Sequence, residues 1–202
     1  MEVPCRIVPT IMMCHMAQPA PSTRLRTMSS EELLTSEEIE AIRSIMDIAF
    51  GHGEDAFAEE DWLHALGGRH FILEEEGEIV THASVVEREL RVGDLLVRTG
   101  YVEAVATRPT RQGCGFGTLV MQAVTTYVHD TFDMGALGTG RHSFYERLGW
   151  QTWRGPAYVR TGMGPTRTPE DEGCILVLRT PTSPPFDGSE AISCDPRVGE
   201  NW

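Results

Sequence analysis

The segment RQGCGFG, residues 111–117, constrains the fold of this chain more than any other stretch, because it places three glycines in five positions. It follows LLVRTGYVEAVATR at 95–108, which predicts a long strand that ends at Pro109. From Gly115 apolar residues recur at helical spacing and predict a helix to about residue 131. Such a loop is either an ordinary turn or a site where free backbone N–H groups meet an anion such as phosphate.

Two common phosphate motifs do not fit this loop. No Gly-Lys-Ser/Thr follows it, which argues against a P-loop, and its glycines are not spaced as GxGxxG, which argues against a dinucleotide site. The chain has 30 acidic and 17 basic residues and a formal charge of −13, so we expect no binding to nucleic acid, whose partners concentrate Lys and Arg.

The remaining patterns predict one α/β domain with strands between two framing helices. The capping box Thr35–Glu38 opens an amphipathic helix over about 36–50, and DWLHALGG predicts a short helix with a Gly-Gly stop. Strands are expected at 23–28, 70–73, 78–92 and in MGALGT and WQTW, and helical turns in SFYERLG. After residue 153 we expect one clear strand, at 174–179, and a polar C-terminal segment that is not a buried strand.

Cysteine and histidine spacing bears on the compartment and on metals. Five widely spaced cysteines without a CxxC predict neither a disulfide framework nor a zinc site and favour a reducing cytoplasm. His64, His70 and His82 lack ligand spacing, so no metal is expected. No apolar run reaches the roughly 20 residues that cross a bilayer. Residues 1–22 are expected to be a flexible N-terminal extension before a domain at 23–202.

The loop and a later motif together resemble a known superfamily. Gln112-x-x-Gly115-x-Gly117, after a long strand and before a helix, and FYERLGW at 144–150 are similar to the coenzyme A loop and closing motif of the GCN5-related N-acetyltransferases (GNATs). The resemblance implies a GNAT fold, a mixed central β-sheet flanked by helices in a single domain. It implies acetyl-CoA bound by Val105, Ala106, Thr107, Gln112, Gly113, Cys114, Gly115, Phe116 and Gly117.

Four further stretches narrow the resemblance. DWLHALGGRH (61–70), GYVEAVA (100–106), GPTRTPEDEG (164–173) and CDPRVGENW (194–202) resemble the aminoglycoside 2′-N-acetyltransferases, in the same order, over roughly residues 23–202. Carboxylates suit a polycationic drug because charge-assisted hydrogen bonds to ammonium groups are strong. The resemblance implies drug contacts by Asp55, Glu103, Ala104, Gly138, Asp171, Glu200 and Trp202. We further expect a cytoplasmic homodimer without a membrane partner.

This sequence departs from the family pattern at two places. The acidic loop GHGEDAF is longer than the family's Gly-Asp-Phe run, so Asp55 or Glu54 takes the place of its aspartate, and we prefer Asp55. Gly138 stands where the family usually has a serine, and the segment before Tyr145 is about two residues shorter. The drug range is therefore expected to differ, toward a smaller drug such as kasugamycin.

The implied reaction is direct attack of the 2′-amine on the thioester carbonyl of acetyl-CoA. Either Glu103 through water or the α-carboxylate of Trp202 accepts the amine's proton, and the residues leave this choice open. The backbone N–H of Val105 is expected to polarise the carbonyl, and Tyr145 to protonate the departing thiolate. Cys114 is not expected to act as a nucleophile, because no histidine has a motif relation to it.

Overall fold

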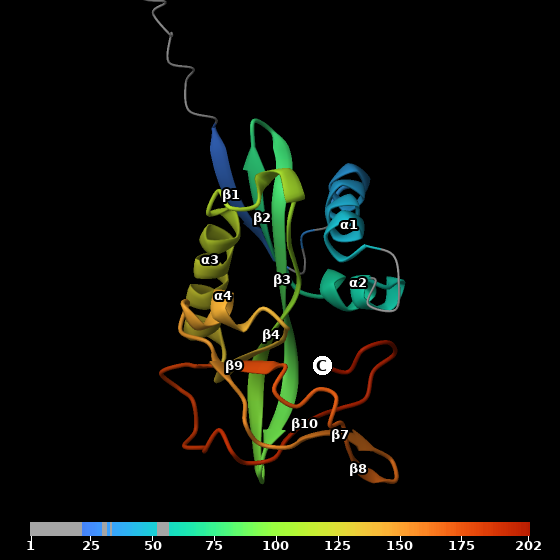
Figure 1. Ribbon diagram of the computed structural model, residues 1–202, viewed down its shortest axis with the longest axis vertical. Coiled ribbons are helices and arrows are strands. Elements are labelled where there is room, and N and C mark those ends of the chain that lie inside the picture. The colour runs from blue at the N-terminus through green and yellow to red at the C-terminus, as the bar shows by residue number, and fades with distance from the viewer. Residues whose placement is uncertain (1–21, 30–31, 33, 52–56) are drawn as a thin grey trace, which may run out of the picture.

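The computed structural model describes residues 22–29, 32, 34–51 and 57–202. Its central feature is a long antiparallel hairpin of β3 (Glu78–Val92) and β4 (Leu95–Thr107), which spans the height of the molecule (Figure 1). These strands belong to a mixed sheet in the order β6-β9-β5-β4-β3-β10-β7-β8, while β2 pairs with both β1 and β3. This mixed sheet with helices on both sides is the predicted GNAT architecture.

The N-terminal elements agree with the sequence patterns. β1 (Thr23–Met28) pairs antiparallel with β2 (Arg69–Glu75). Thr35 caps α1 (Ser36–Phe50) and forms the predicted capping box with Glu38. The short helix α2 (Glu59–Leu66) ends at Gly67, as the Gly-Gly stop predicts. The flexible extension and the domain boundary at residue 22 stay predictions, because residues 1–21 lie outside the described part of the chain.

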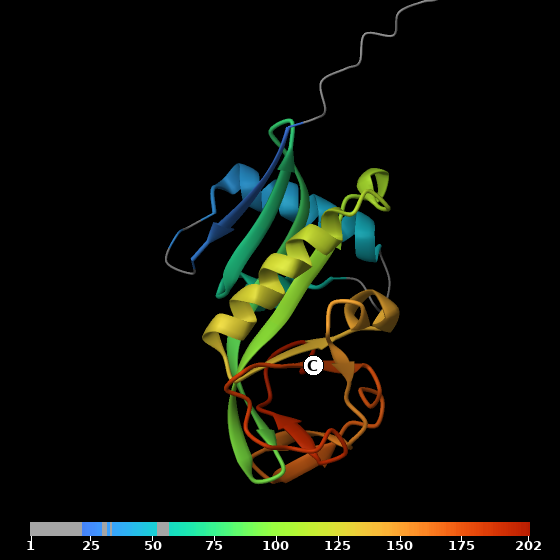
Figure 2. The ribbon, with the colours of Figure 1, turned by 90° about the vertical axis from the view of Figure 1, so that its left-hand side faces the viewer.

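The second half of the domain contains the elements that follow the glycine-rich loop. They are α3 (Phe116–Thr131), β5 (Met134–Gly138), α4 (His142–Glu146), β6 (Gln151–Thr152) and β9 (Ile175–Arg179). α1 and α2 cover one face of the sheet, whereas α3 and α4 cover the other (Figures 1 and 2). Trp62, Trp150 and Trp153 are at most 2% exposed, so all three belong to the core.

The expectation of one strand after residue 153 is wrong. The structure adds β7 (Ala157–Thr161), β8 (Gly164–Arg167) and β10 (Ile192–Cys194). β7 and β8 form a hairpin, and β10 lies between β7 and β3, parallel to the first and antiparallel to the second. A strand of three residues is too short to show a period in the sequence, and its partners lie far away along the chain. The segment after Cys194 forms no strand, as predicted.

The sheet and helices enclose three clusters of buried apolar side chains. One lies between the sheet and α3, one under the C-terminal segment, and one between the sheet and α1 and α2. Gly135 allows the first cluster to close, because a Cβ there would lie within 3.0 Å of Trp150, Val128 and Leu178. Within the described residues, every helix is too short or too polar to cross a bilayer.

Candidate functional site

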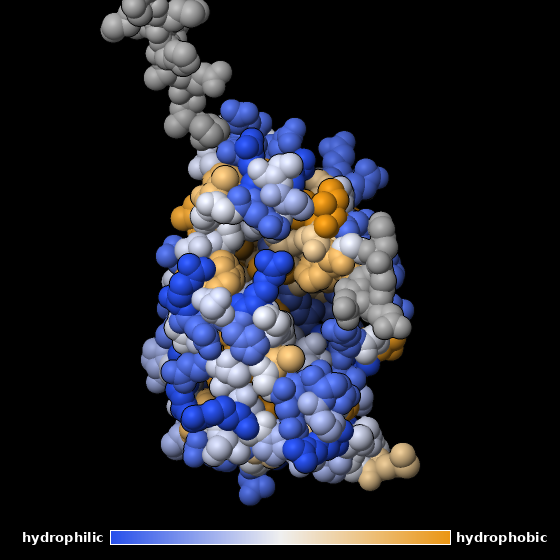
Figure 3. All heavy atoms as spheres, in the orientation of Figure 1, coloured by the Kyte–Doolittle hydropathy of each residue, from blue (hydrophilic) through white to orange (hydrophobic). Residues whose placement is uncertain are grey.

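A cavity of about 790 Å³ opens where two parallel strands separate. β4 pairs with β5 only from Thr99 to Tyr101, so the following residues of β4 have one edge free to line the cavity. The cavity reaches from the glycine-rich loop to the C-terminal residue. Its volume lies in the ordinary range for small-molecule sites, roughly 300–1,000 Å³. Figure 3 shows the hollow on this face, with apolar side chains gathered in the upper half beside it.

A bulge in β4 shapes the cavity wall. Ala104 and Val105 together lie opposite Ala83, and Ala104 has φ of 51°, a conformation that side chains rarely adopt. The Ala104 carbonyl accepts a 2.8 Å hydrogen bond from Nδ1 of His82, which is fully buried. His82 in turn contacts His70, Nε2 to Nδ1 at 3.0 Å. The two imidazoles thus support the bulge from behind, a role that the sequence reasoning missed.

The glycine-rich loop has the geometry of an anion site. A short 3-10 turn, Pro109–Arg111, follows β4, and the Gln112 side chain donates to the Thr107 carbonyl at 3.2 Å. Gly113 and Gly115 have φ of 78° and 85°, so both need the freedom of glycine. Gly115 is the N-cap of α3, and no side chain caps that end. The first N–H groups of α3 are therefore available to a ligand, together with the positive end of the helix dipole.

Most of the predicted cofactor residues line this part of the cavity. They are Val105, Ala106, Thr107, Gln112, Gly113, Gly115, Phe116 and Gly117. Cys114 is exposed and is not among the lining residues. Three arginines that the sequence reasoning missed, Arg111, Arg141 and Arg147, also line the cavity. Arg111 is the first residue of the motif RQGCGFG, so its place beside the glycines could have predicted that it lines the cavity.

Tyr145 lies on α4 and lines the cavity while only 8% of it is exposed. Burial raises the pKa of its phenol to about 12, and Arg141 opposes that shift. The phenol therefore keeps its proton at neutral pH. This state is the one that a hydrogen-bond donor or general acid requires.

The other end of the cavity carries acids and one arginine. Asp61, Glu103 and Glu200 line it, together with Arg197. Glu103 is only 8% exposed and forms an ion pair with Nη1 of Arg197, which was not predicted. Arg197 also donates from Nε to the Glu200 carbonyl at 2.6 Å. Arg197 is the single cation in the acidic segment CDPRVGENW, and this feature of the sequence could have predicted that it pairs with a carboxylate.

The chain end forms part of the cavity wall. The Trp202 side chain is buried in the cluster under the C-terminal segment, and Trp202 and Gly138 both line the cavity. A Cβ on Gly138 would lie 3.3 Å from the carboxyl carbon of Trp202 and 3.6 Å from the Tyr101 hydroxyl. The α-carboxylate of Trp202 therefore lies against the end of β5, closer than a serine at 138 allows without adjustment.

Of the remaining predicted substrate residues, Ala104 lies at the bulge and lines the cavity. Asp171 lies in the turn between β8 and β9 and is not among the lining residues. Burial raises the pKa of its carboxyl. Asp55 and its alternative Glu54 lie outside the described residues. Across the described ranges, no group of three or more His, Cys, Asp or Glu side chains is arranged to hold a metal ion.

The cavity thus has two chemically different ends. The arginines come from the loop and from either side of α4, and with the uncapped α3 they suit phosphate groups. The acids come from α2, β4 and the chain end, and they suit ammonium groups. Between them lies the bulge of β4, with Tyr145 nearby on the wall.

Comparison with known families identifies the family of the chain. Residues 32–153 match the model of the acetyltransferase (GNAT) domain. The chain is 40% identical over 174 residues to an aminoglycoside 2′-N-acetyltransferase of Mycolicibacterium fortuitum. The aligned residues cover 84% of this chain and 87% of that relative.

Solved structures share the fold at low identity. The GNAT family N-acetyltransferase YhbS of Escherichia coli, in complex with CoA, matches 89% of this chain and 93% of its own with a TM-score of 0.63 and 14% identity. A GCN5-related N-acetyltransferase of Kribbella flavida matches 67% of this chain with a TM-score of 0.55 and 21% identity. This chain spans only 34% of the length of the Kribbella protein.

Proposed function

The chain belongs to the aminoglycoside 2′-N-acetyltransferase family of the GNAT acetyltransferases, and from this membership we propose that it transfers acetyl from acetyl-CoA to the 2′-amine of an aminoglycoside. The observation that carries the proposal is the cavity with a glycine-rich, arginine-bearing end and a carboxylate-bearing end, joined by the free edge of β4. The first end fits a pyrophosphate and the second fits a polycation. Such a reaction would confer resistance to the drug.

Acetyl-CoA is proposed to lie along β4 with its pyrophosphate on the loop. The N–H groups of Gly113 to Gly117 and the uncapped end of α3 would bind the phosphate oxygens. Arg111 lines the same part of the cavity, and its guanidinium is also ion-paired with Glu75. The pantetheine would follow the edge of β4 that β5 leaves free after Tyr101. The thioester would then lie at the bulge, where the N–H of Val105 polarises its carbonyl.

The drug is proposed to occupy the acidic end. Glu103, Glu200 and the α-carboxylate of Trp202 would bind its ammonium groups, with Ala104 and Gly138 as neutral wall. Asp171 and Asp55 remain predicted contacts. Either the Trp202 carboxylate or Glu103 accepts the proton of the reacting amine, and Tyr145 donates its phenolic hydrogen to the departing sulfur. Holding the two substrates together contributes most of the acceleration, up to ~7–11 kcal/mol in favourable cases.

The altered wall at Gly138 supports a different drug range. The Cβ of a serine at 138 would lie 3.3 Å from the carboxyl carbon of Trp202. The present position of that carboxylate therefore favours a residue without a side chain at 138. We propose that kasugamycin is among the drugs accepted. The free cysteines Cys114, Cys174 and Cys194 support a reducing cytoplasm as the compartment. The homodimer stays a prediction.

The test is a thiol-release assay. The protein is mixed with acetyl-CoA and a thiol reagent, and aminoglycosides with and without a 2′-amine, kasugamycin and a polyamine are added in turn. We expect thiol release with drugs that carry the 2′-amine, and NMR of the product should locate the acetyl group on that nitrogen. Release with the polyamine alone would assign another amine substrate, and no release with any amine would indicate a non-catalytic binding protein.

A further inference from the structure

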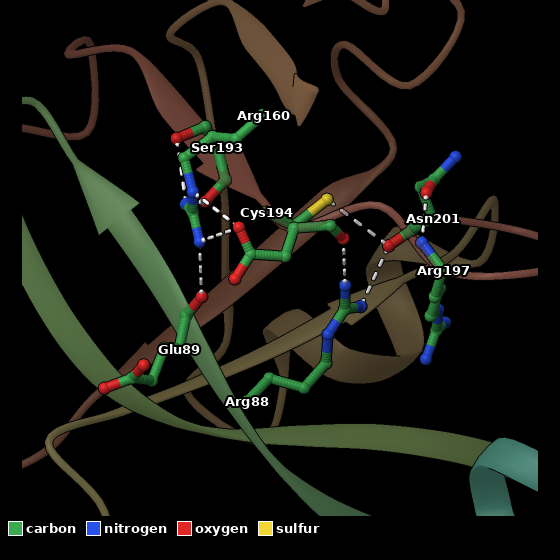
Figure 4. A network of polar contacts seen from close by, with 8 residues as sticks. Arg88, Glu89, Arg160, Ser193, Cys194, Arg197 and Asn201 are labelled. Carbon is green, nitrogen blue, oxygen red and sulfur yellow. Dashed lines mark hydrogen bonds and ion pairs between the residues drawn. The ribbon is translucent and has the colours of Figure 1, made fainter. Parts of the chain in front are cut away.

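The last residues of the chain are fixed by an arginine that the reaction itself does not use. Arg88, on β3, donates from Nη1 to the carbonyl of Asn201 at 2.8 Å and from Nη2 to the carbonyl of Asp195 at 3.5 Å (Figure 4). The Cys194 thiol also reaches the Asn201 carbonyl, at 3.5 Å. Arg88 and Asn201 are separated by 113 positions in the sequence. One guanidinium thus closes the C-terminal segment into a loop against the sheet.

Arg88 is held rigidly enough to serve as a support. Its guanidinium stacks over the Tyr101 ring at 4.6 Å, and Arg197 lies over the same ring at 5.6 Å. Burial, together with the nearby Arg197, lowers the pKa of Arg88. A partly buried cation is costly unless it is hydrogen-bonded. The carbonyls of Asp195 and Asn201 accept these hydrogen bonds. The guanidinium therefore holds the backbone of the C-terminal segment in place, and that backbone in turn holds the guanidinium.

The residue that follows Asn201 is the one whose carboxylate reaches the cavity. The carboxyl carbon of Trp202 lies 3.3 Å from the Cβ position of Gly138, at the cavity wall. Burial of the indole fixes the side chain of Trp202. It does not by itself fix the carboxylate, which can still turn about the last backbone bonds. The bond from Arg88 to the Asn201 carbonyl restrains the peptide directly before those bonds.

We propose that Arg88 is a positioning residue for the transfer, which fixes the terminal carboxylate of Trp202 in the acidic end of the cavity. The proposal rests on the proposed function, in which that carboxylate binds the drug or accepts its proton. C-terminal residues are ordinarily poorly ordered. A displacement of about 1 Å in a catalytic group is enough to reduce the rate about 100-fold.

Arg160 provides a matched control on the same segment. It donates to the Ser193 carbonyl at 2.7 Å and to the Asp195 carboxylate at 2.9 Å, and it also reaches the Glu89 carbonyl (Figure 4). These contacts fix the start of the C-terminal segment rather than its end. Arg160→Met therefore removes a comparable guanidinium without touching Asn201, whereas Arg88→Met removes the restraint on the chain end.

The kinetic experiment compares these variants with and without a C-terminal extension of a few residues. We expect Arg88→Met to lower kcat/KM for the aminoglycoside at least tenfold with the KM for acetyl-CoA unchanged, Arg160→Met to stay within about threefold of wild type, and Arg88→Lys to recover part of the loss. The extension alone should also lower kcat/KM at least tenfold. In Arg88→Met the extension should add little, because the carboxylate is already displaced. Wild-type kinetics for Arg88→Met, or losses that multiply fully in the double variant, would overturn the proposal.

A second measurement does not depend on the substrate. Carboxypeptidase releases a terminal tryptophan only when the chain end leaves its site. We expect slow release from wild type and Arg160→Met and release at least tenfold faster from Arg88→Met, at equal thermal midpoints. Equal release rates would overturn the inference, whether or not the protein acetylates aminoglycosides. A different outcome separates the two proposals. If no amine releases thiol but carboxypeptidase acts fastest on Arg88→Met, the proposed function is refuted and the restraint on the chain end is established.

Discussion

The buried pair His70–His82 makes the stability of this protein depend on pH in a specific way. His82 is fully buried, and burial lowers its pKa from 6.5 to about 3, with a smaller contribution from His70. The folded protein therefore keeps His82 neutral, while the unfolded chain takes up a proton below pH 6.5. The folded state therefore has its full stability, as far as His82 is concerned, above about pH 6.5, and it loses stability as the pH falls toward 3.

The size of this effect follows from the two pKa values. Each pH unit within that window changes the free energy of unfolding by about 1.4 kcal/mol. Between pH 7.5 and pH 5, His82 alone should cost about 2 kcal/mol of stability. His82→Gln is the matched variant, because its amide can donate to the Ala104 carbonyl and accept from His70 but does not titrate. Its stability should therefore fall about 2 kcal/mol less over the same range.

Urea unfolding of both proteins at several pH values between 7.5 and 5 measures this difference. Parallel pH profiles for wild type and His82→Gln would refute the reasoning, because they would show that His82 takes up no proton on unfolding. His82→Leu tests the structural role at constant pH. It leaves the Ala104 carbonyl without its donor and should destabilise the fold by about 1–3 kcal/mol, and by displacing Val105 it should lower kcat more than it changes the KM for acetyl-CoA.

Three further substitutions test the proposed site. Gly115→Asp should raise the KM for acetyl-CoA at least tenfold, and more than the uncharged control Gly115→Asn, because it places a negative charge where the phosphates are proposed to bind; equal effects of the two would remove the phosphate role. Tyr145→Phe keeps the ring packing and removes the phenolic hydrogen, so kcat should fall at least tenfold at an unchanged drug KM, whereas a change in KM alone would make it a binding residue. Gly138→Ser presses on the carboxyl carbon of Trp202 and should raise the drug KM several-fold with little change in thermal midpoint, which steady-state kinetics and thermal unfolding can check together.

The sequence predicted the elements that neighbouring residues encode. The capping box at Thr35 and Glu38 gives the start of α1, and the glycines of the loop give the start of α3 within one residue. In these cases the hydrogen bonds or dihedral angles that define the element lie within a few positions of each other. The bounds of β3 and β4 are likewise predicted closely, because the Gly93-Asp94 turn and Pro109 mark the strand ends in the sequence itself.

The missed features all depend on distant segments. β10 has three residues and is defined by its pairing with β3 on one side and β7 on the other, both of which lie far from it along the chain. His70 and His82 meet because a hairpin brings their strands together, although neither has ligand spacing in the sequence. The pair of Glu103 and Arg197 joins positions 94 residues apart. No local pattern contains these distances, so the composition of a motif can suggest an acidic pocket but cannot give the partner of each acid.

The partner of Glu103 also bears on which amines the site can select. Arg197 occupies one oxygen of Glu103, so an incoming ammonium group has to exchange with a guanidinium that is already hydrogen-bonded there. A monoamine replaces one charge-assisted bond by another and gains little from the exchange. A polycation gains more, because its other ammonium groups lie within reach of Glu200 and the carboxylate of Trp202 on the same wall. Arg197 meanwhile keeps its bond to the Glu200 carbonyl and its stacking on Tyr101. On the proposed function, the ion pair therefore discriminates against small amines and favours substrates with several positive charges.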